Sequence, residues 1–421
     1  MGIPFFYMSL IRQHSGIVKP IKNIQTDILC IDFNCLIHKY LKDSEPIQSV
    51  LDGLELIMKL CNSKKTIIYL DGLVPYSKMI QQRYRRFRIK EPAIFDRNQI
   101  SPDTPYMREL EKALEKYPIE ISGTLKAGEG EQKLFKNLKS FNEKNIVVYG
   151  LDADLILLSL YHSKKFTEFY LLRESQELNC EGEFSLLNIK LLCKLIPIEI
   201  EQFLYLCILC FGNDFMPNLG LFSLRDGGYQ RALDIYNKSG SPNLKLEEGR
   251  YKFLQESEKI EWEFYQKRKN PFERYVIGKD KQTFSKKYNL HVLDGLQNIE
   301  KVVESFWKTF HWTIEYFIEN KSTNWNWAYM YPDAPLIMDI LEFYETSHKS
   351  EKHSMTLSKH LAFILPSKSL LKRHKKFEDE WYSETRPLWI KKHEWESKPF
   401  LSLPWHPTDS LTSIKTLNDH F

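Results

Sequence analysis

Acidic residues at the ends of apolar segments are the part of this sequence that could do chemistry. Asp32, Asp71 and Asp152 each end or closely follow a short apolar or β-branched segment of the kind that forms a buried strand. Asp154 follows two residues after Asp152, where one turn at a helix start can aim both side chains inward. The carboxyl ends of parallel strands border the ligand crevice of an open sheet, so we expect these carboxylates to converge.

Three further acids lie in short glycine-containing motifs, Gly128–Glu131 and Gly212–Asp214. Seven carboxylates in one crevice repel one another unless cations offset their charge. Mg²⁺ or Mn²⁺ suits oxygen ligands, and two such ions about 3.5–4 Å apart can clamp a reacting phosphodiester. Any one of these acids could instead be a helix cap or a surface charge, so the prediction depends on the combination. The expected metal ligands are Asp32, Asp71, Glu129, Glu131, Asp152, Asp154 and Asp214.

A strongly basic segment follows the second of these strands. Lys78–Lys90 contains six Lys and Arg residues and no acid. Such a surface can bind a terminal phosphate through charge-assisted, bidentate hydrogen bonds. A solvated helix surface is the alternative, and the absence of interleaved acids that would pair with the basic residues disfavours it. The residues that share one helix face are Lys78, Gln82, Arg85 and Arg86.

The elements that must position these residues alternate over the first 240 residues. The expected strands are Asp27–Asp32, Thr66–Asp71, Ile119–Ser122, Asn145–Tyr149 and Glu168–Leu172. The amphipathic segments between them include Ile47–Cys61, Lys78–Arg88, Tyr106–Tyr117 and Glu131–Phe141. This alternation predicts an α/β domain over residues 1–240, with a mainly parallel central sheet and helices on both faces. Long charged segments, Leu246–Lys267 and Val292–Phe310, predict a mostly helical second region over residues 241–421.

Composition narrows the class of protein. The 421 residues are 43% hydrophobic and 27% charged, which provides for a buried core and excludes a mostly disordered chain. Without an apolar stretch of the roughly 20 residues that span a membrane, or a signal-peptide pattern, we expect an intracellular protein, cytoplasmic in preference to nuclear. Cys207 and Cys210 form a C-x-x-C within an apolar run, and without a second pair we expect core thiols instead of zinc ligands.

The order of the motifs resembles that of Xrn-type 5′→3′ exoribonucleases. The resemblance is dense to about residue 235 and thin to about residue 340. It implies a 5′-nuclease/PIN-like fold, with residues 1–240 as the Xrn N-terminal nuclease domain and residues 241–421 packing on it. The matching segments are Met1–Pro4, Ile31–Asn34, Leu70–Gly72, Pro75–Arg88, Gly128–Glu131, Tyr149–Leu155 and Gly212–Phe215, with further likeness at Leu171–Glu174, Ser223–Gly227 and Ser322–Pro332.

The resemblance also implies a role for each candidate residue. The seven acids look like the metal-binding and catalytic acids of the family, and Lys78, Gln82, Arg85 and Arg86 like its pocket for a 5′-monophosphate, with Lys78 also catalytic. His38 is similar to the histidine that stacks on the 5′-terminal base, although a histidine satisfied within its helix is the alternative. Trp325 or Trp327 would stack from the other side, unless both are core residues. Cys35 departs from the pattern, because the family typically has Gly there.

These expectations combine into one activity, a hydrolase of RNA degradation and mRNA decay. It would cleave 5′-monophosphorylated single-stranded RNA into nucleoside 5′-monophosphates with two Mg²⁺ or Mn²⁺ ions, acting as a monomer without a membrane partner. A structure-specific 5′ flap or DNA nuclease of the related superfamily and a catalytically silent RNA 5′-end binding module are the alternatives. A basic stretch could contact RNA or direct nuclear import, although a solvated helix face is the simpler explanation. Its residues are Lys368, Lys372, Arg373, Lys375 and Lys376.

Overall fold

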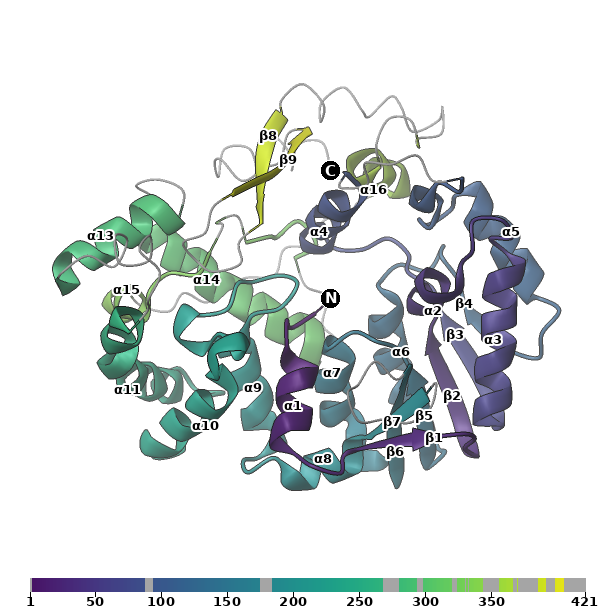
Figure 1. Cartoon of the computed structure of the whole chain (residues 1–421), viewed down its shortest axis with the longest axis horizontal. Coiled ribbons are helices and arrows are strands. Elements are labelled where there is room, and N and C mark those ends of the chain that lie inside the picture. The colour runs from purple at the N-terminus through teal and green to yellow at the C-terminus, as the bar shows by residue number, and fades with distance from the viewer. Residues whose placement is uncertain are drawn as a thin grey trace.

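A seven-stranded sheet forms the centre of the N-terminal part, and a group of helices extends from it to one side (Figure 1). The computed structural model describes residues 2–87, 94–174, 184–267, 280–293, 298–319, 324–329, 331, 333–343, 356–365, 369, 385–390 and 398–404. The basic stretch between Lys368 and Lys376 therefore lies outside the described residues. Within the described ranges, no helix has the length and hydrophobicity that crossing a membrane requires.

The sheet is mainly parallel, as the alternating pattern predicts. Its strand order is β1-β7-β6-β5-β2-β3-β4, and the five strands from β6 to β4 run parallel. All five expected strands are present: β2 (Thr26–Asp32), β3 (Ser63–Tyr69), β4 (Glu120–Ser122), β5 (Asn145–Tyr149) and β6 (Glu168–Glu174). Two further strands, β1 (Val18–Ile21) and β7 (Phe184–Asn188), which the sequence pattern does not predict, add antiparallel pairs at one edge of the sheet. Pro20 within β1 suits an edge strand, because proline cannot donate to a central ladder.

Alternate residues of β2 face two separate hydrophobic clusters, since side chains point to opposite faces along a strand. Leu29 and Ile31 belong to a cluster shared with α2 (Phe33–Tyr40), α3 (Gln48–Cys61) and α5 (Pro105–Leu114). Ile28 and Cys30 belong to a cluster shared with α1 (Phe6–Gln13), α6 (Gly130–Leu138), α7 (Asp154–His162) and α8 (Ile189–Leu195). Helices therefore cover both faces of the sheet, which confirms the predicted α/β class.

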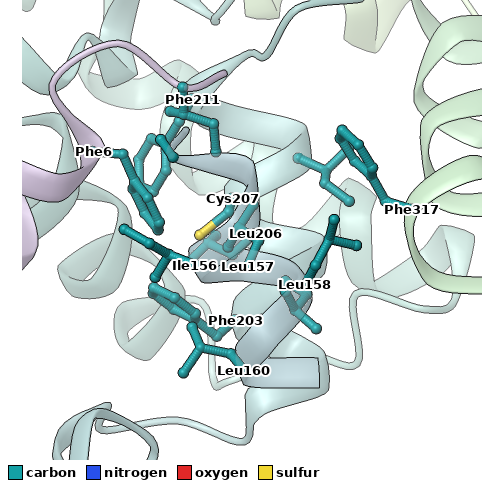
Figure 2. Packing of buried hydrophobic residues seen from close by; sticks show 14 of the residues in the cluster. Phe6, Ile156, Leu157, Leu158, Leu160, Phe203, Leu206, Cys207, Phe211 and Phe317 are labelled. Carbon is teal, nitrogen blue, oxygen red and sulfur yellow. The ribbon is translucent and has the colours of Figure 1, made fainter. Parts of the chain in front are cut away.

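The second cluster continues into the helical region. Every residue from Phe203 to Phe211 except Tyr205 is buried in α9 (Ile200–Phe211), which packs against α1 through Phe6 (Figure 2). Phe317, from the C-terminal half of the chain, reaches the same cluster (Figure 2). Cys207 and Cys210 are free, buried thiols, which confirms their assignment to the core.

The described residues after residue 240 are mostly helical, as expected. Its helices are α11 (Glu247–Gln266), α13 (Lys281–Val292), α14 (Ile299–Ile314), α15 (Ile337–Glu342) and α16 (Leu357–Ile364), after α10 (Gly228–Lys238), and a hairpin of β8 (Thr385–Ile390) and β9 (Lys398–Pro404) follows. Most of the expected helical segment Val292–Phe310 lies in α14, which begins only at Ile299. The Asn298 side chain accepts a hydrogen bond from the main-chain N–H of Lys301 and so caps the start of α14. The domain boundary near residue 240 stays a prediction.

Candidate functional site

A cavity of about 520 Å³ opens at the carboxyl end of the central strand β2. After β2 the chain builds β3 and β4 on one side, and then β5 and β6 on the other, so the strand order reverses here. Ligand crevices of open parallel sheets form at such a switch point. Asp32 ends β2, whereas Asp71 and Asp152 lie just beyond β3 and β5, and all three line the cavity.

The cavity combines most of the acids with the basic helix. Five of the seven predicted acids line it, and so do the four residues predicted to bind phosphate, which project from α4 (Tyr76–Phe87). His38 of α2 lines it as well. The five acids are Asp32, Asp71, Glu129, Glu131 and Asp152, and the residues of α4 are Lys78, Gln82, Arg85 and Arg86. Separate segments therefore meet in one space, as the sequence predicts.

Short hydrogen bonds join the loops that carry the acids. The Asn34 side chain accepts from the main-chain N–H of Asp71 at 2.9 Å, and Asp71 Oδ1 accepts from the main-chain N–H of Gly130 at 2.7 Å. A Cβ atom on Gly130 would lie 2.9 Å from the carbonyl oxygen of Tyr69. Only glycine therefore lets the start of α6 approach β3 closely enough to hold Asp71 and to bring its own acids to the cavity.

The two remaining acids, Asp154 and Asp214, lie next to the cavity and do not line it. Asp214 Oδ2 is 3.0 Å from Lys78 Nζ, and Asp214 Oδ1 accepts from the main-chain N–H of Gly2 at 3.0 Å. A Cβ atom on Gly2 would lie 2.6 Å from Asp154 Oδ1, so the N-terminal segment passes directly over both acids. All seven predicted acids thus lie close together: five line the cavity, and Asp154 and Asp214 lie next to those five without lining it.

Lys78 is the counter-ion at the centre of this neighbourhood. Its Nζ lies 2.6 Å from Glu129 Oε2 as well as 3.0 Å from Asp214 Oδ2, and all three side chains are less than a tenth exposed. The Tyr316 hydroxyl donates to the other oxygen of Glu129 at 2.7 Å. Burial alone would lower the pKa of Lys78, but Glu129 and Asp214 raise it well above its ordinary value, so the ammonium group stays charged.

One lysine does not neutralise so many carboxylates. Burial, reinforced by the charges of Asp71 and Asp152, raises the pKa of Asp32 to about 8. Burial, together with a neighbouring carboxylate in each case, also raises the pKa of Glu131 and of Asp154 well above the ordinary range. Asp214 differs: burial raises its pKa, but nearby positive charge, above all the Lys78 ammonium, and hydrogen bonds to its carboxylate together outweigh burial and lower the pKa. Ionising all of these acids would therefore leave a surplus of negative charge, which a bound cation would offset.

The donor set fits hard divalent cations. Its ligands would all be carboxylate oxygens, which Mg²⁺ and Mn²⁺ prefer, and among the described residues Asp154 Oδ1 is buried without a hydrogen-bond partner. No three His, Cys, Asp or Glu side chains in the described part of the chain are arranged as a ready metal site. Lys78 explains this arrangement, because its ammonium group forms ion pairs with Glu129 and Asp214 in the metal-free site. A metal ion that used either acid would displace that contact.

The basic side of the cavity is more extensive than expected. Arg86 is held by hydrogen bonds to Ser101 Oγ at 2.9 Å and to the Ile100 carbonyl at 3.3 Å. Burial and the neighbouring Arg85 lower the pKa of Arg86 to about 9, so an anion beside the two guanidinium groups would stabilise both. Lys39 and Arg97 also line the cavity, and no motif in the sequence singled them out.

The predicted base-stacking residues are placed differently from one another. His38 lines the cavity, and burial together with Arg85 lowers its pKa to about 4, so its ring is neutral. Trp325 and Trp327 do not line the cavity. Their main-chain carbonyls accept hydrogen bonds from Tyr76 and Ser77 at the start of α4, and the Trp327 indole donates to Thr309 at 3.1 Å. The segment therefore supports α4, and the stacking role of either Trp stays a prediction.

Several supporting residues escaped the sequence analysis. Tyr316 holds Glu129 from a segment 187 residues away, and Arg173 donates to the carbonyl of Leu151 at 2.6 Å, beside Asp152. Nothing in the sequence near Tyr316 points to an active site. Asn34 and Arg173 lie in Ile31–Asn34 and Leu171–Glu174, two of the segments on which the resemblance rests, so that signal could have found them.

Comparisons with known proteins agree with these observations. A family model described as "XRN 5'-3' exonuclease N-terminus" matches residues 1–93 and 89–175. The 5'-3' exoribonuclease 1 of Saccharomyces cerevisiae is 29% identical over 335 residues, covering 58% of this chain and 22% of the relative. The 5'-3' exoribonuclease 2 of Candida glabrata is 25% identical over 365 residues (58% and 36%), and the human 5'-3' exoribonuclease 1 is 28% identical over 299 residues (52% and 17%). The chain thus spans only 17–36% of the length of these relatives.

Two solved structures with partial similarity are complexes of proteins with DNA. The catalytic core of Rad2 in complex with a DNA substrate has a TM-score of 0.39 and 14% identity, covering 66% of this chain and 78% of that one. Human GEN1 in complex with Holliday junction DNA has a TM-score of 0.39 and 14% identity, covering 74% and 80%. These scores are too low to add to what the family model shows. Residues 1–175, which carry six of the seven candidate metal-site acids and the whole of α4, are thus similar to the N-terminal part of XRN 5'-3' exonucleases.

Proposed function

We propose that this chain is a metal-dependent 5′→3′ exoribonuclease. It removes nucleoside 5′-monophosphates from single-stranded RNA that carries a 5′-monophosphate. The observation that carries this proposal is a single cavity lined by both the acids and the basic face of α4. The names of the relatives, 5'-3' exoribonuclease 1 and 2, support it.

The basic face of α4 is suited to hold the 5′ end. Arg85 and Arg86 would bind the phosphate through charge-assisted hydrogen bonds, and Gln82 would add a neutral donor. The cavity, about 520 Å³, lies in the ordinary range of pockets for small ligands, which suits one terminal nucleotide. A pocket sized for one phosphate would exclude capped and triphosphorylated ends by sterics and charge. The neutral ring of His38 would stack on a terminal base of any sequence.

The carboxylates would hold two Mg²⁺ or Mn²⁺ ions. When bound, these ions supply an activated water and stabilise the departing 3′-oxygen of the scissile phosphodiester. The side chains available for this are Asp32, Asp71, Glu129, Glu131, Asp152, Asp154 and Asp214. In the metal-free site Glu129 and Asp214 raise the pKa of Lys78. Its ammonium group would offset negative charge that develops on the phosphate.

End-defined substrates test the proposal. Two RNAs of one sequence, one with a 5′-monophosphate and one with a 5′-hydroxyl, are incubated with the native chain in Mg²⁺, in Mn²⁺ and in a chelator. We expect metal-dependent release of nucleoside 5′-monophosphates and much faster degradation of the phosphorylated RNA. Equal rates on the two RNAs would remove the phosphate pocket from the proposal.

The same assay separates the two alternatives. Preferential cleavage of flapped DNA would identify a structure-specific DNA nuclease instead. Asp152→Ala is expected to reduce RNA turnover at least 100-fold, because its carboxylate lies among the metal-binding acids. Binding of phosphorylated RNA ends without turnover, unaltered in this variant, would identify a catalytically silent end-binding module.

A further inference from the structure

The helix α4, which carries the basic residues of the cavity, packs against α16, a helix near the C-terminus. α16 lies beside α4 (Figure 1), and Val74, Tyr76 and Met79 pack with Leu361 and Phe363 in one small hydrophobic cluster. This contact joins segments almost 300 residues apart, so α16 forms the outer support of the phosphate-facing helix.

A buried arginine fastens the two helices together. Arg83 is fully buried, and its guanidinium group donates a hydrogen bond to the carbonyl of Phe363 while lying 4.8 Å from the centre of the Phe363 ring. That carbonyl lies in the last turn of α16, where a cation is favoured by the helix dipole. The position of α16 relative to α4 is therefore tightly defined.

Gln82 of α4 contacts both the cavity and the supporting helix α16. It lines the cavity, and its Oε1 lies 3.1 Å from Nε2 of His360, a fully buried residue of α16. An amide oxygen only accepts hydrogen bonds, so Nε2 of His360 must carry the donated proton. Because Oε1 is used by His360, Gln82 can offer the two N–H donors of its Nε2 group to a ligand in the cavity.

The protonation state of His360 agrees with this assignment. Burial and the charge of Arg86 lower its pKa to about 3, so the ring is neutral and carries one proton. Among the described residues His360 Nδ1 has no hydrogen-bond partner. A proton on Nδ1 would be a buried, unsatisfied N–H, which is rarer in proteins than an unpaired acceptor. The proton therefore belongs on Nε2, facing Gln82.

We propose that His360 is a positioning residue that fixes the Gln82 amide with its N–H donors towards the 5′-phosphate. This inference rests on the proposed function, in which Gln82 contacts that phosphate. A phosphate offers only acceptors, so a reversed Gln82 amide would set its carbonyl oxygen against the phosphate oxygens. His360 prevents that reversal by occupying the carbonyl. The C-terminal helix thereby contributes to selectivity for phosphorylated ends without touching the substrate.

Variants of His360 test this on the full chain with the two end-defined RNAs. His360→Leu keeps a similar volume and removes the donor. We expect kcat/KM for the 5′-monophosphate RNA to fall about tenfold, the worth of one hydrogen bond, with most of the change in KM. The preference for the phosphorylated RNA should fall by the same factor. His360→Gln, whose amide N–H can reach the place of Nε2, should stay within about twofold of the native preference.

A matched control and a double variant separate positioning from mere stability. Leu361→Val lies on the same buried helix and leaves the hydrogen bond intact, so its preference should equal that of the native chain. Gln82→Leu should lose preference, and His360→Leu added to it should cause no further loss, because both act through one amide. Should His360→Leu fail to fold, His360→Asn replaces it, since its shorter amide cannot reach Gln82.

The possible results either support or overturn the positioning role of His360. Loss of preference in His360→Leu, recovery in His360→Gln and non-additivity with Gln82→Leu support the inference. Equal loss on both RNAs, or a further loss in the double variant, overturns it. A native chain that prefers phosphorylated RNA while His360→Leu keeps that preference overturns the inference alone. A native chain without turnover or preference overturns the proposed function, and this inference with it.

Discussion

Replacing Lys78 by methionine should destabilise the protein by an amount that depends on pH. Lys78 lies 2.6 Å from Glu129 and 3.0 Å from Asp214, and the three side chains are 8%, 3% and 5% exposed. Methionine fills most of the space and removes the charge. Breaking a buried ion pair by removing one partner costs about 3–5 kcal/mol of the free energy of unfolding, because the other charge remains buried and unpaired.

The sign of the pH dependence follows from the acids that lose their partner. Burial already raises the pKa of Glu129, and removing the Lys78 ammonium that lowers it should raise it further. A carboxyl group whose pKa is higher in the folded state contributes stability below its ordinary pKa and loses it as the pH rises through the folded value. Lys78→Met should therefore resemble the native chain near pH 5 and show its full deficit near pH 8.

Denaturant unfolding in a chelator at both pH values measures this difference. Lys64→Met is the matched control, since Lys64 lies 2.7 Å from Asp27 but is 82% exposed, and exposed pairs contribute little. A divalent cation should restore part of the lost stability of Lys78→Met, because it can replace the ammonium beside Glu129. A deficit that is the same at pH 5 and pH 8, or no larger than that of Lys64→Met, would refute the reasoning about the buried cluster.

Two further substitutions probe how the acids are held. Tyr316→Phe removes the hydroxyl that donates a hydrogen bond to Glu129 at 2.7 Å. Because a hydrogen bond to a charged group contributes about 1.5–3 kcal/mol, the denaturant midpoint of unfolding should fall. An unchanged midpoint would contradict the contact. Gly130→Ala would place a Cβ atom 2.9 Å from the Tyr69 carbonyl oxygen and push the Gly130 N–H away from Asp71. RNA turnover should therefore drop at least tenfold, while the far-ultraviolet circular dichroism spectrum stays like that of the native chain. Gly240→Ala, at a site with no heavy atom within 4 Å of the added Cβ and a positive φ, should affect stability alone, and a similar loss of turnover there would argue against a local effect at Gly130.

The sequence determined those parts of the fold that depend on local pattern. The five parallel strands follow apolar or β-branched runs, and the helices between them follow the 3.6-residue spacing of their apolar faces. The sequence pattern does not predict the antiparallel strands β1 and β7. β1 is a short edge strand with a weak pattern, and β7 takes its place from pairing with β1 on one side and with β6 on the other. The expected segment Val292–Phe310 begins seven residues before α14 does, because the exact start of that helix is set by the cap at Asn298.

The sequence also determined the chemistry of the candidate site, because residue type and strand ends suffice to predict that carboxylates converge beside a basic helix face. Only the tertiary structure decided how these groups are paired. Lys78 binds Glu129 and Asp214, Tyr316 reaches Glu129 across 187 residues, and His360 meets Gln82 across 278 residues. Contacts of this kind depend on how α14 and α16 pack against the sheet domain, and no local spacing encodes the packing of helices so distant along the chain.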